Sequence, residues 1–452
     1  MAEELADQPD KTAEELADQP DKTAEELADQ PDKTAEELAD QPKGTAEELA
    51  DQPKSTAEEL AGMSSAEYAF SEEQGQLRDA VAAFCAEHID ESAVRAQMES
   101  DPPFDAKVWA RLGSELGVLG LSVPESRGGV GGSLIDQAVA VEQLGAALAC
   151  GPLFGTVYLA IPALVAASES PENTALLEPL TDGSRTAAFA VTDTAGAFDP
   201  AAVQVEAART PQEWALTGTV ERVVDAGAAD ILLVAANGPD GLGLFAVDAD
   251  TAGVRRTVRS TLDLTRPQAD VELRDAPARL VAGPEEAGRV IGHALHVGSA
   301  LLAVEQVGAA AHLLDLTVQY AKSRLQFGRP IGSFQTVKHR LADDLIALEH
   351  AKSTAYHAIW ALTDGSDDPG LAVVIAAATC SDALTRIATD TIQVHGGIGF
   401  TWEHQAHLYY KRAYTDAVLL GGAEQHRDRI AASVLDGPPE KNPPRVATGV
   451  PT

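Results

Sequence analysis

The sequence predicts a fold of the α+β class that is mainly α. We expect an N-terminal helical domain, a middle domain of antiparallel β-strands and a C-terminal four-helix bundle. Two observations support this order. The chain has 452 residues, about three times the usual domain size, so several domains are expected. Apolar residues recur at helical spacing toward both ends, whereas short apolar runs separated by Gly, Asp and Pro fill the stretch between them.

These patterns divide the chain into five segments. Residues 1–62 are an acidic repeat that we expect to be disordered. Residues 63–184 form the N-terminal helical domain, and residues 185–283 form the β domain. Residues 284–436 form the bundle, and the Pro-rich end, 437–452, is a flexible tail.

The first segment repeats the unit T-A-E-E-L-A-D-Q-P-D-K. It carries 20 acidic residues and 5 lysines in 62 residues, and so contributes −15 to a formal net charge of −37. Each unit has a single Leu as its large apolar side chain, and a Pro in nearly every unit breaks a helix. These features predict a disordered tail, with a docking segment that folds on a partner as the alternative. Ordinary sequence begins at Met63, so an upstream extension of a chain that starts there is also consistent.

The helical domain is predicted to begin near Phe70, because Ser71 and the two Glu after it suit a helix N-terminus. Two further helices are predicted over 105–119 and 134–148, on either side of a Gly-rich loop. Short apolar runs then predict the strands of the middle domain, over 187–191, 203–207, 214–216, 231–235 and 244–247.

Three long helices are predicted in the last domain. Pro284, followed by two Glu, marks the start of the first. Apolar residues from Phe334 to Leu348 mark the second, which is expected to stop at Gly365, and a third helix includes residues 373–387. Apolar stripes of this kind pack together in a helix bundle.

Composition excludes several classes of protein. A net charge of −37 argues against a nucleic-acid or anionic-membrane partner. Cys85, Cys150 and Cys380 are odd in number and widely spaced, which excludes a disulfide framework and a C-x-x-C metal knuckle. No stretch approaches the ~18–20 apolar residues of a membrane span, and the N-terminus lacks the features of a signal peptide. A cytoplasmic protein is expected.

Simple catalytic motifs are absent from the sequence. No Ser or Cys lies in a G-x-S-x-G elbow, and there is no P-loop. His404 and His407 lie three residues apart on a predicted helix, but no third ligand accompanies them, so we expect surface histidines and no metal. The glycines after His395 follow a helix, whereas a dinucleotide loop would follow a strand. Alone, they are as consistent with a tight helix–helix turn as with a cofactor loop.

Two motifs together identify a family. Residues 324–335 read R-L-Q-F-G-R-P-I-G-S-F-Q and are followed by L-A-D at 341–343, and residues 393–403 read Q-V-H-G-G-I-G-F-T-W-E. In this order and spacing they strongly resemble the acyl-CoA dehydrogenase family of flavoenzymes. The resemblance extends along residues 63–436 and implies the acyl-CoA dehydrogenase-like fold, an acyl-CoA substrate, and an electron-transferring flavoprotein as electron acceptor.

The resemblance also implies that the chain binds FAD across a subunit interface, so a homo- or hetero-oligomer, a dimer or tetramer, is expected. A guanidinium suits phosphate oxygens, and glycines let backbone N–H groups approach the cofactor closely. Thr192 lies in a weakened form of the family's T-E-P strand, and Val224 stands where a Thr or Ser usually flanks the isoalloxazine. The residues assigned to FAD in this way are Arg324, Phe327, Gln335, Gln393, Gly396, Gly397 and Thr192.

The catalytic base is the part of the family pattern that this sequence lacks. In the family reaction a carboxylate takes the α-proton of an acyl-CoA thioester, while the β-hydrogen leaves as hydride to the flavin. The resemblance places that carboxylate at Leu420, or at Gly421 with one gap, or at Gly298, and none of these residues is a Glu. Glu424, one helical turn from Leu420, is a weak candidate for the base. Glu305 lies two turns beyond Gly298 and is expected to form a salt bridge or to pack between helices.

Three functions remain open from the sequence. The first is an FAD-dependent acyl-CoA dehydrogenase with an unorthodox base. The second is an FAD-holding, base-lacking subunit of a heteromeric acyl-CoA dehydrogenase, in which a paralogous partner supplies the Glu. Heteromeric enzymes of actinobacterial steroid side-chain degradation are similar to this. The third is a binding module without turnover, against which the intact Arg324, Gln335 and Gln393 argue.

Deleting residues 1–62 is expected to leave the melting temperature and the flavin content unchanged. The repeats have too few apolar side chains to offset an ordering entropy of roughly 1–2 kcal/mol per residue. Differential scanning calorimetry of the full and the shortened chain measures this. A large drop in melting temperature on truncation would show that the repeats pack on the core.

Overall fold

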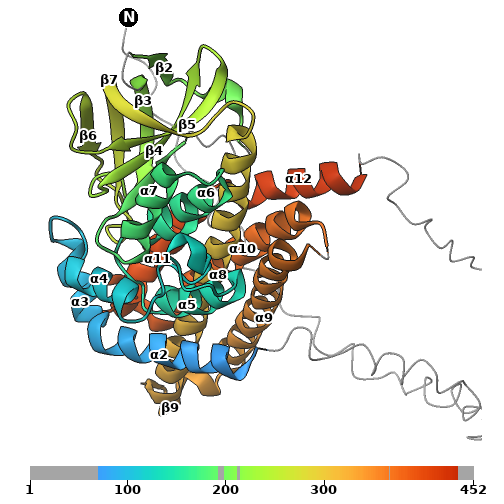
Figure 1. Ribbon diagram of the computed structural model, residues 1–452. Coiled ribbons are helices and arrows are strands. Elements are labelled where there is room, and N and C mark those ends of the chain that lie inside the picture. The colour runs from blue at the N-terminus through green and yellow to red at the C-terminus, as the bar shows by residue number, and fades with distance from the viewer. Residues whose placement is uncertain (1–69, 192–197, 211–213, 366, 436–452) are drawn as a thin grey trace, which may run out of the picture. The chain divides into compact units, whose positions relative to one another are not determined.

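The computed structural model describes residues 70–191, 198–210, 214–365 and 367–435. Along the chain, helices come first, followed by a β-sheet and then by long helices. The strands gather at one end of the described part (Figure 1). The predicted fold class is therefore confirmed. Thr192, one of the residues assigned to FAD, lies outside the described residues.

The N-terminal helices begin where the sequence predicts. Ser71 caps the first α-helix: its hydroxyl accepts from the Gln74 backbone N–H, and the Gln74 side chain accepts from the Ser71 N–H in return. This reciprocal capping box satisfies two backbone donors that a helix start leaves open. The helices of this region are α2 (Glu72–His88), α3 (Glu91–Met98), α4 (Ala106–Ser114), η1 (Glu125–Arg127), α5 (Leu134–Ala146), η2 (Leu153–Ala160), α6 (Ile161–Ala166) and α7 (Pro171–Thr181).

The middle region is a seven-stranded sheet with the order β1-β4-β2-β3-β7-β5, in which β6 pairs with β7. Its strands are β1 (Ala187–Ala190), β2 (Glu206–Arg209), β3 (Trp214–Val224), β4 (Ile231–Gly238), β5 (Gly241–Asp248), β6 (Val254–Val258) and β7 (Gln268–Ala282). A short η3 (Pro200–Ala202) precedes β2.

Two features of this sheet differ from the prediction. The sheet is mixed, because β4 pairs in parallel with β1 and β2, while the other pairs are antiparallel. The strands β6 and β7 were not predicted from the sequence. None of the residues of β6 is buried, and in β7 buried residues alternate with more exposed ones, so neither strand contains a continuous apolar run.

The C-terminal helices pack as a bundle. Helix α8 (Ala287–Ser323) contacts α9 (Gln335–Asp364) and α10 (Pro369–His395), and α10 contacts α11 (Ala406–Asp416) and α12 (Ala423–Leu435). Helix α9 ends at Gly365, as predicted, because that residue has a φ of 65°, which a glycine adopts without strain.

Two glycines set how closely α5 approaches α8 (Figure 1). A Cβ atom at Gly308 would lie 1.9 Å from the Glu142 carbonyl oxygen, and one at Gly145 would lie 2.4 Å from the Glu305 carbonyl oxygen. A side chain at either position would push the helices apart. This close crossing fixes Glu305 between the two helical domains.

Two helices of the described part have the length and composition of membrane spans. The most apolar stretches of Ala287–Ser323 and Pro369–Phe400 have mean hydropathies of 1.4 and 1.6. Of these stretches, 89% and 61% is buried inside the protein. Their apolar character therefore serves packing within the bundle, as it does in core helices.

Candidate functional site

The two motifs that carry the family resemblance lie at neighbouring helix ends. The Thr317 hydroxyl on α8 donates to the Thr391 hydroxyl on α10 over 2.9 Å. One turn later, the rings of Tyr320 and His395 stack with centroids 4.2 Å apart. Arg324 follows the end of α8, and the glycine turn η5 (Gly396–Phe400) follows α10. The structure therefore brings residues 324–335 and 393–399 together, although about 60 residues separate them in the chain.

A small hairpin presents the first of these motifs. Strands β8 (Leu325–Gln326) and β9 (Arg329–Pro330) pair around Phe327 and Gly328, which have φ values of 52° and 75°. Such values suit glycine and cost energy for Phe, which marks a turn held by its surroundings. The Phe327 side chain is 92% exposed, and the Arg329 guanidinium lies 4.0 Å above the Phe334 ring. The hairpin thus exposes an aromatic ring three residues after Arg324.

The remaining residues of the motif set fit a nucleotide cofactor. Arg324, Gln335 and Gln393 are exposed, so their polar groups face outward from the helix ends. Gly396 and Gly397 have no atom within 4 Å of the position that a Cβ would take. Open backbone next to a guanidinium and two amides is the donor set that a pyrophosphate and an adenosine require. Their exposure on a single chain agrees with a cofactor that is shared across a subunit interface.

A cavity of ≈ 670 Å³ lies between the β-sheet and the helices. Val224 and Leu420 both line it, so the two residues that the resemblance places beside the isoalloxazine and at the base position lie in one cavity. Val191, which precedes Thr192, lines it as well. The lining combines apolar and polar side chains: Phe154, Leu159, Phe189, Val191, Gln204, Thr219, Glu221, Arg222, Val223, Val224, Gln268, Leu295, Val418, Leu419 and Leu420.

Neither usual base position offers a carboxylate, and Gly298 has no room for a side chain. Leu420 is 6% exposed and has a φ of 56°. At Gly298 a Cβ atom would lie 2.5 Å from Leu159 Cδ2 and 3.2 Å from the Tyr158 carbonyl oxygen. Apolar packing therefore replaces the base at both positions.

The structure shows where the other carboxylates stand. The Glu424 side chain is 92% exposed and lies 3.4 Å from the Arg427 guanidinium, and it does not line the cavity. Among the described residues, Glu221 is the one carboxylate of the cavity lining. Its side chain is 60% exposed and lies 3.8 Å from Arg259, so it stands at the rim. The sequence alone does not indicate Glu221, because only folding places this β3 residue at the cavity.

Behind the cavity lies a buried ionic cluster, which we define as Asp263, Arg266, Glu305, Arg412 and Asp416. Arg266 donates to both Glu305 oxygens over 2.5 and 2.6 Å and to Asp416 Oδ1 over 2.7 Å. Arg412 donates to Glu305 Oε1 over 2.6 Å and to Asp263 Oδ2 over 2.9 Å. All five side chains are at most 4% exposed. The predicted salt-bridge role of Glu305 is thus confirmed.

Two carboxylates of this cluster have pKa values that are shifted in opposite directions. Burial alone would raise the pKa of Glu305, but Arg266 and Arg412 together lower it to about 2. Burial raises the pKa of Asp416 to about 7, although Arg266 works against this. Arg266 also lies 5.3 Å from the ring centroid of Phe154, which lines the cavity. The cluster therefore joins the sheet to the helices directly behind the cavity wall.

The two histidines considered as metal ligands have other roles. His404 Nδ1 accepts from the Ala406 N–H, ahead of α11. His407 is 5% exposed and packs edge-on against Trp402, so the prediction of a surface histidine is wrong for this residue. Burial lowers the pKa of His407 to about 4. Among the described residues no group of His, Cys, Asp and Glu is arranged to hold a metal.

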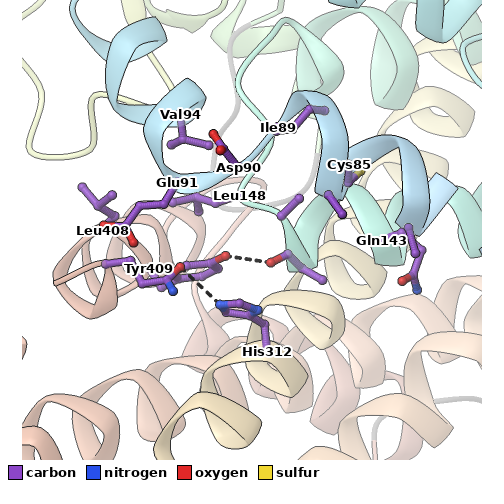
Figure 2. Close-up of a pocket in the computed structure, with 15 residues that line it drawn as sticks. Cys85, Ile89, Asp90, Glu91, Val94, Gln143, Leu148, His312, Leu408 and Tyr409 are labelled. Carbon is purple, nitrogen blue, oxygen red and sulfur yellow. Dashed lines mark hydrogen bonds between the residues drawn. The ribbon is translucent and has the colours of Figure 1, made fainter.

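A second pocket, of ≈ 340 Å³, lies between α2, α3, α5, α8 and α11 (Figure 2). His312 stacks on Tyr409 at its base with ring centroids 4.9 Å apart, and its Nε2 lies 3.3 Å from Gln405 Oε1. The Tyr409 hydroxyl donates to the Ala146 carbonyl over 2.7 Å. The pocket contains none of the residues that the sequence assigns to FAD or to the base.

Comparisons with known proteins agree with these features. Two family models match: "Acyl-CoA dehydrogenase, N-terminal domain" over residues 71–184 and "Acyl-CoA dehydrogenase, C-terminal domain" over residues 287–435. The acyl-CoA dehydrogenase IpdE2 of Mycolicibacterium smegmatis is 36% identical over 365 residues, which cover 81% of this chain and 100% of that protein.

Solved structures show the same fold. A variant of the Tcur3481–Tcur3483 steroid ACAD is 30% identical with a TM-score of 0.73, over 81% of this chain and 98% of that one. The ChsE4–ChsE5 complex from Mycobacterium tuberculosis is 29% identical with a TM-score of 0.74, over 82% of this chain and 99% of that one. The chain therefore belongs to the acyl-CoA dehydrogenase family, whose members are oxidoreductases that act on CH–CH bonds.

Proposed function

We propose that this chain is the FAD-holding, base-lacking subunit of a heteromeric acyl-CoA dehydrogenase. The observation that carries the proposal is the contrast between the two halves of the site. The exposed Arg324, Gln335 and Gln393 form a set suited to FAD, while Leu420 and the packed Gly298 fill both base positions. Similarity to one chain of the ChsE4–ChsE5 complex supports a second, different subunit.

In this proposal the chain's own residues bind and orient, while the partner supplies the base. FAD, when bound, would accept the hydride from the β-carbon of the acyl thioester. Arg324 would pair with its phosphate oxygens, and Gln335 and Gln393 would hydrogen-bond its polar edges. The apolar walls of the cavity would hold the acyl chain and exclude water, which raises the basicity of a carboxylate brought in by a partner.

The remaining assignments rest on similarity and are part of the same proposal. The substrate is an acyl-CoA with a fatty or steroid-derived acyl chain, since one similar structure is described as a steroid ACAD. The electron acceptor is an electron-transferring flavoprotein, as the family resemblance implies. The protein works in the cytoplasm as an oligomer.

Arg324→Ala is expected to weaken FAD binding about 10- to 100-fold, because a charge-assisted hydrogen bond contributes ~1.5–3 kcal/mol. The visible spectrum and a flavin titration of the purified protein, with its partner if one copurifies, measure this. Arg274→Ala is the matched control, since Arg274 is 73% exposed and belongs neither to the two motifs nor to the cavity lining. A wild-type protein that is colourless and takes up no FAD, alone or with a partner, would refute the assignment.

A further inference from the structure

A small cavity shares the wall formed by Leu419 and Leu420 with the ≈ 670 Å³ cavity. Its volume is ≈ 10 Å³, about the space that one water molecule requires. It lies between α8, α10, α11 and α12. Its lining combines polar and apolar side chains: Ser299, Leu302, Ala303, Gln306, Ala377, Ser381, Asp416, Leu419, Leu420, Gly421 and His426.

Two buried polar atoms of this lining have no hydrogen-bond partner among the described residues. They are Asp416 Oδ2 and His426 Nδ1, and both side chains are 2% exposed. The other Asp416 oxygen is engaged, since Oδ1 accepts from Arg266. A buried polar atom without a partner costs ~1–3 kcal/mol, so native proteins rarely leave one unpaired.

One molecule can pair with both atoms. Burial lowers the pKa of His426, so its imidazole is neutral at pH 7. The imidazole bonds to the backbone at Leu420 and Gly421, and Nε2 is the nitrogen left for these bonds because Nδ1 has no partner. Nδ1 of that tautomer is an acceptor, whereas the Asp416 oxygen accepts when the carboxyl group is ionised and donates when it is protonated. A water molecule can donate to Nδ1 and either donate to or accept from Asp416, so it suits both states.

The backbone that His426 contacts is strained and forms part of the site. Leu420 has a φ of 56° and Gly421 a φ of 103°. A non-glycine residue in this region costs ~1–3 kcal/mol and persists only where its surroundings hold it. Leu419 and Leu420 line both cavities, so whatever holds this turn also sets the wall of the larger one.

We propose that the small cavity binds one water molecule that bridges Asp416 and His426, and that His426 is thereby a positioning residue for the 419–421 turn. The bridge completes a continuous polar connection. It runs from the loop before β7 through Arg266 and Asp416 to the water, and on through His426 to the backbone of the turn. Hydrogen bonds, as well as direct packing, thus connect the ionic cluster to the cavity wall. The role of the turn rests on the proposed function, but the water site does not.

Two variants separate the bridge from the bonds to the turn. His426→Gln keeps a donor near the position of Nε2 and loses the acceptor at Nδ1, whereas His426→Leu loses both. A high-resolution crystal structure of the wild-type protein should show one ordered water within hydrogen-bond distance of Asp416 Oδ2 and His426 Nδ1. In His426→Leu the water should be absent and the 419–421 turn displaced, with FAD affinity reduced about tenfold. In His426→Gln the turn should stay in place, with FAD affinity within about twofold of wild type.

Other outcomes overturn the proposal. A dry cavity in the wild-type crystal structure refutes the water site, whether or not the protein binds FAD. An unmoved turn and unchanged FAD affinity in His426→Leu refute the positioning role. An equal loss of melting temperature in both variants, without any movement of the turn, also refutes it, because that pattern reflects packing alone. If the protein binds no FAD at all, the proposed function fails, while the crystal structures still decide the water site and the turn.

Discussion

Purified alone, the chain is expected to dehydrogenate acyl-CoA substrates about 10²–10⁴-fold more slowly than its complex with a Glu-bearing homologue, because a positioned general base contributes a factor of that size. Leu420 and the packed Gly298 leave both usual base positions without a carboxylate. Turnover of acyl-CoA with an artificial electron acceptor, measured for the chain alone and after coexpression with such a homologue, tests this directly.

Two carboxylates of the chain itself provide the controls. Glu424→Gln and Glu221→Gln should leave the activity of the complex unchanged, because Glu424 is turned to solvent and Glu221 stands at the cavity rim. If the isolated chain is active and Glu424→Gln abolishes turnover while sparing the flavin spectrum, Glu424 is the base and no partner is needed. Robust turnover by the isolated chain that survives both substitutions would mean that another group takes the proton.

Arg412→Ala is expected to destabilise the protein by ~3–5 kcal/mol, the usual cost of removing one partner from a buried ion pair. Arg412 bonds to Glu305, to Asp263, and to the Thr265 carbonyl and hydroxyl, all from a fully buried position. Its loss leaves Asp263 without that guanidinium and Glu305 with Arg266 and the Tyr158 hydroxyl as its remaining partners. Chemical denaturation measures the change, and Arg274→Ala on the surface should change stability by less than ~1 kcal/mol.

This destabilisation should depend on pH with a definite sign. The pKa of Glu305 in the folded protein is about 2, lower than the ~4.3 of an unperturbed Glu. Its stabilising contribution is therefore present above pH ~4 and is lost as the pH falls through about 2. The penalty of Arg412→Ala should shrink over the same window. A penalty that stays constant from pH 7 to the acid limit, or one no larger than that of Arg274→Ala, would contradict this account of the cluster.

Most of what could be predicted depends on patterns among residues that are close together in the sequence. Apolar periodicity and caps located the helices, so Ser71 and Gly365 bound α2 and α9 as expected. The motifs around Arg324 and Gln393 identified the family, and counting along those motifs predicts that Leu420 and Gly298 stand where the family has its base. All of these are local patterns, because capping, helix periodicity and motif spacing depend on residues within a few turns of one another.

The strands show where local patterns stop being sufficient. β7 pairs with β3, β5 and β6. Its buried residues alternate with more exposed ones, so it contains no continuous apolar run that would predict a strand. β1 pairs in parallel with β4, about 40 residues later in the chain. Because parallel strands cannot be joined by a tight turn, the register of this pair depends on the whole sheet. The buried position of His407 likewise depends on how Trp402 folds back over α11.

The sequence by itself determined the order of the domains, the residues suited to FAD and the absence of a Glu at the base positions. Only the tertiary structure decided what occupies the space behind the cavity. Arg266 meets Asp416 across 150 residues of chain, and Arg412 meets Glu305 across 107. No local rule pairs residues so far apart, because their contact depends on the packing of α8 and α11 against the loop before β7. Burial among those elements, more than residue type, makes Glu305 a structural ion and gives Asp416 and His426 a shared cavity.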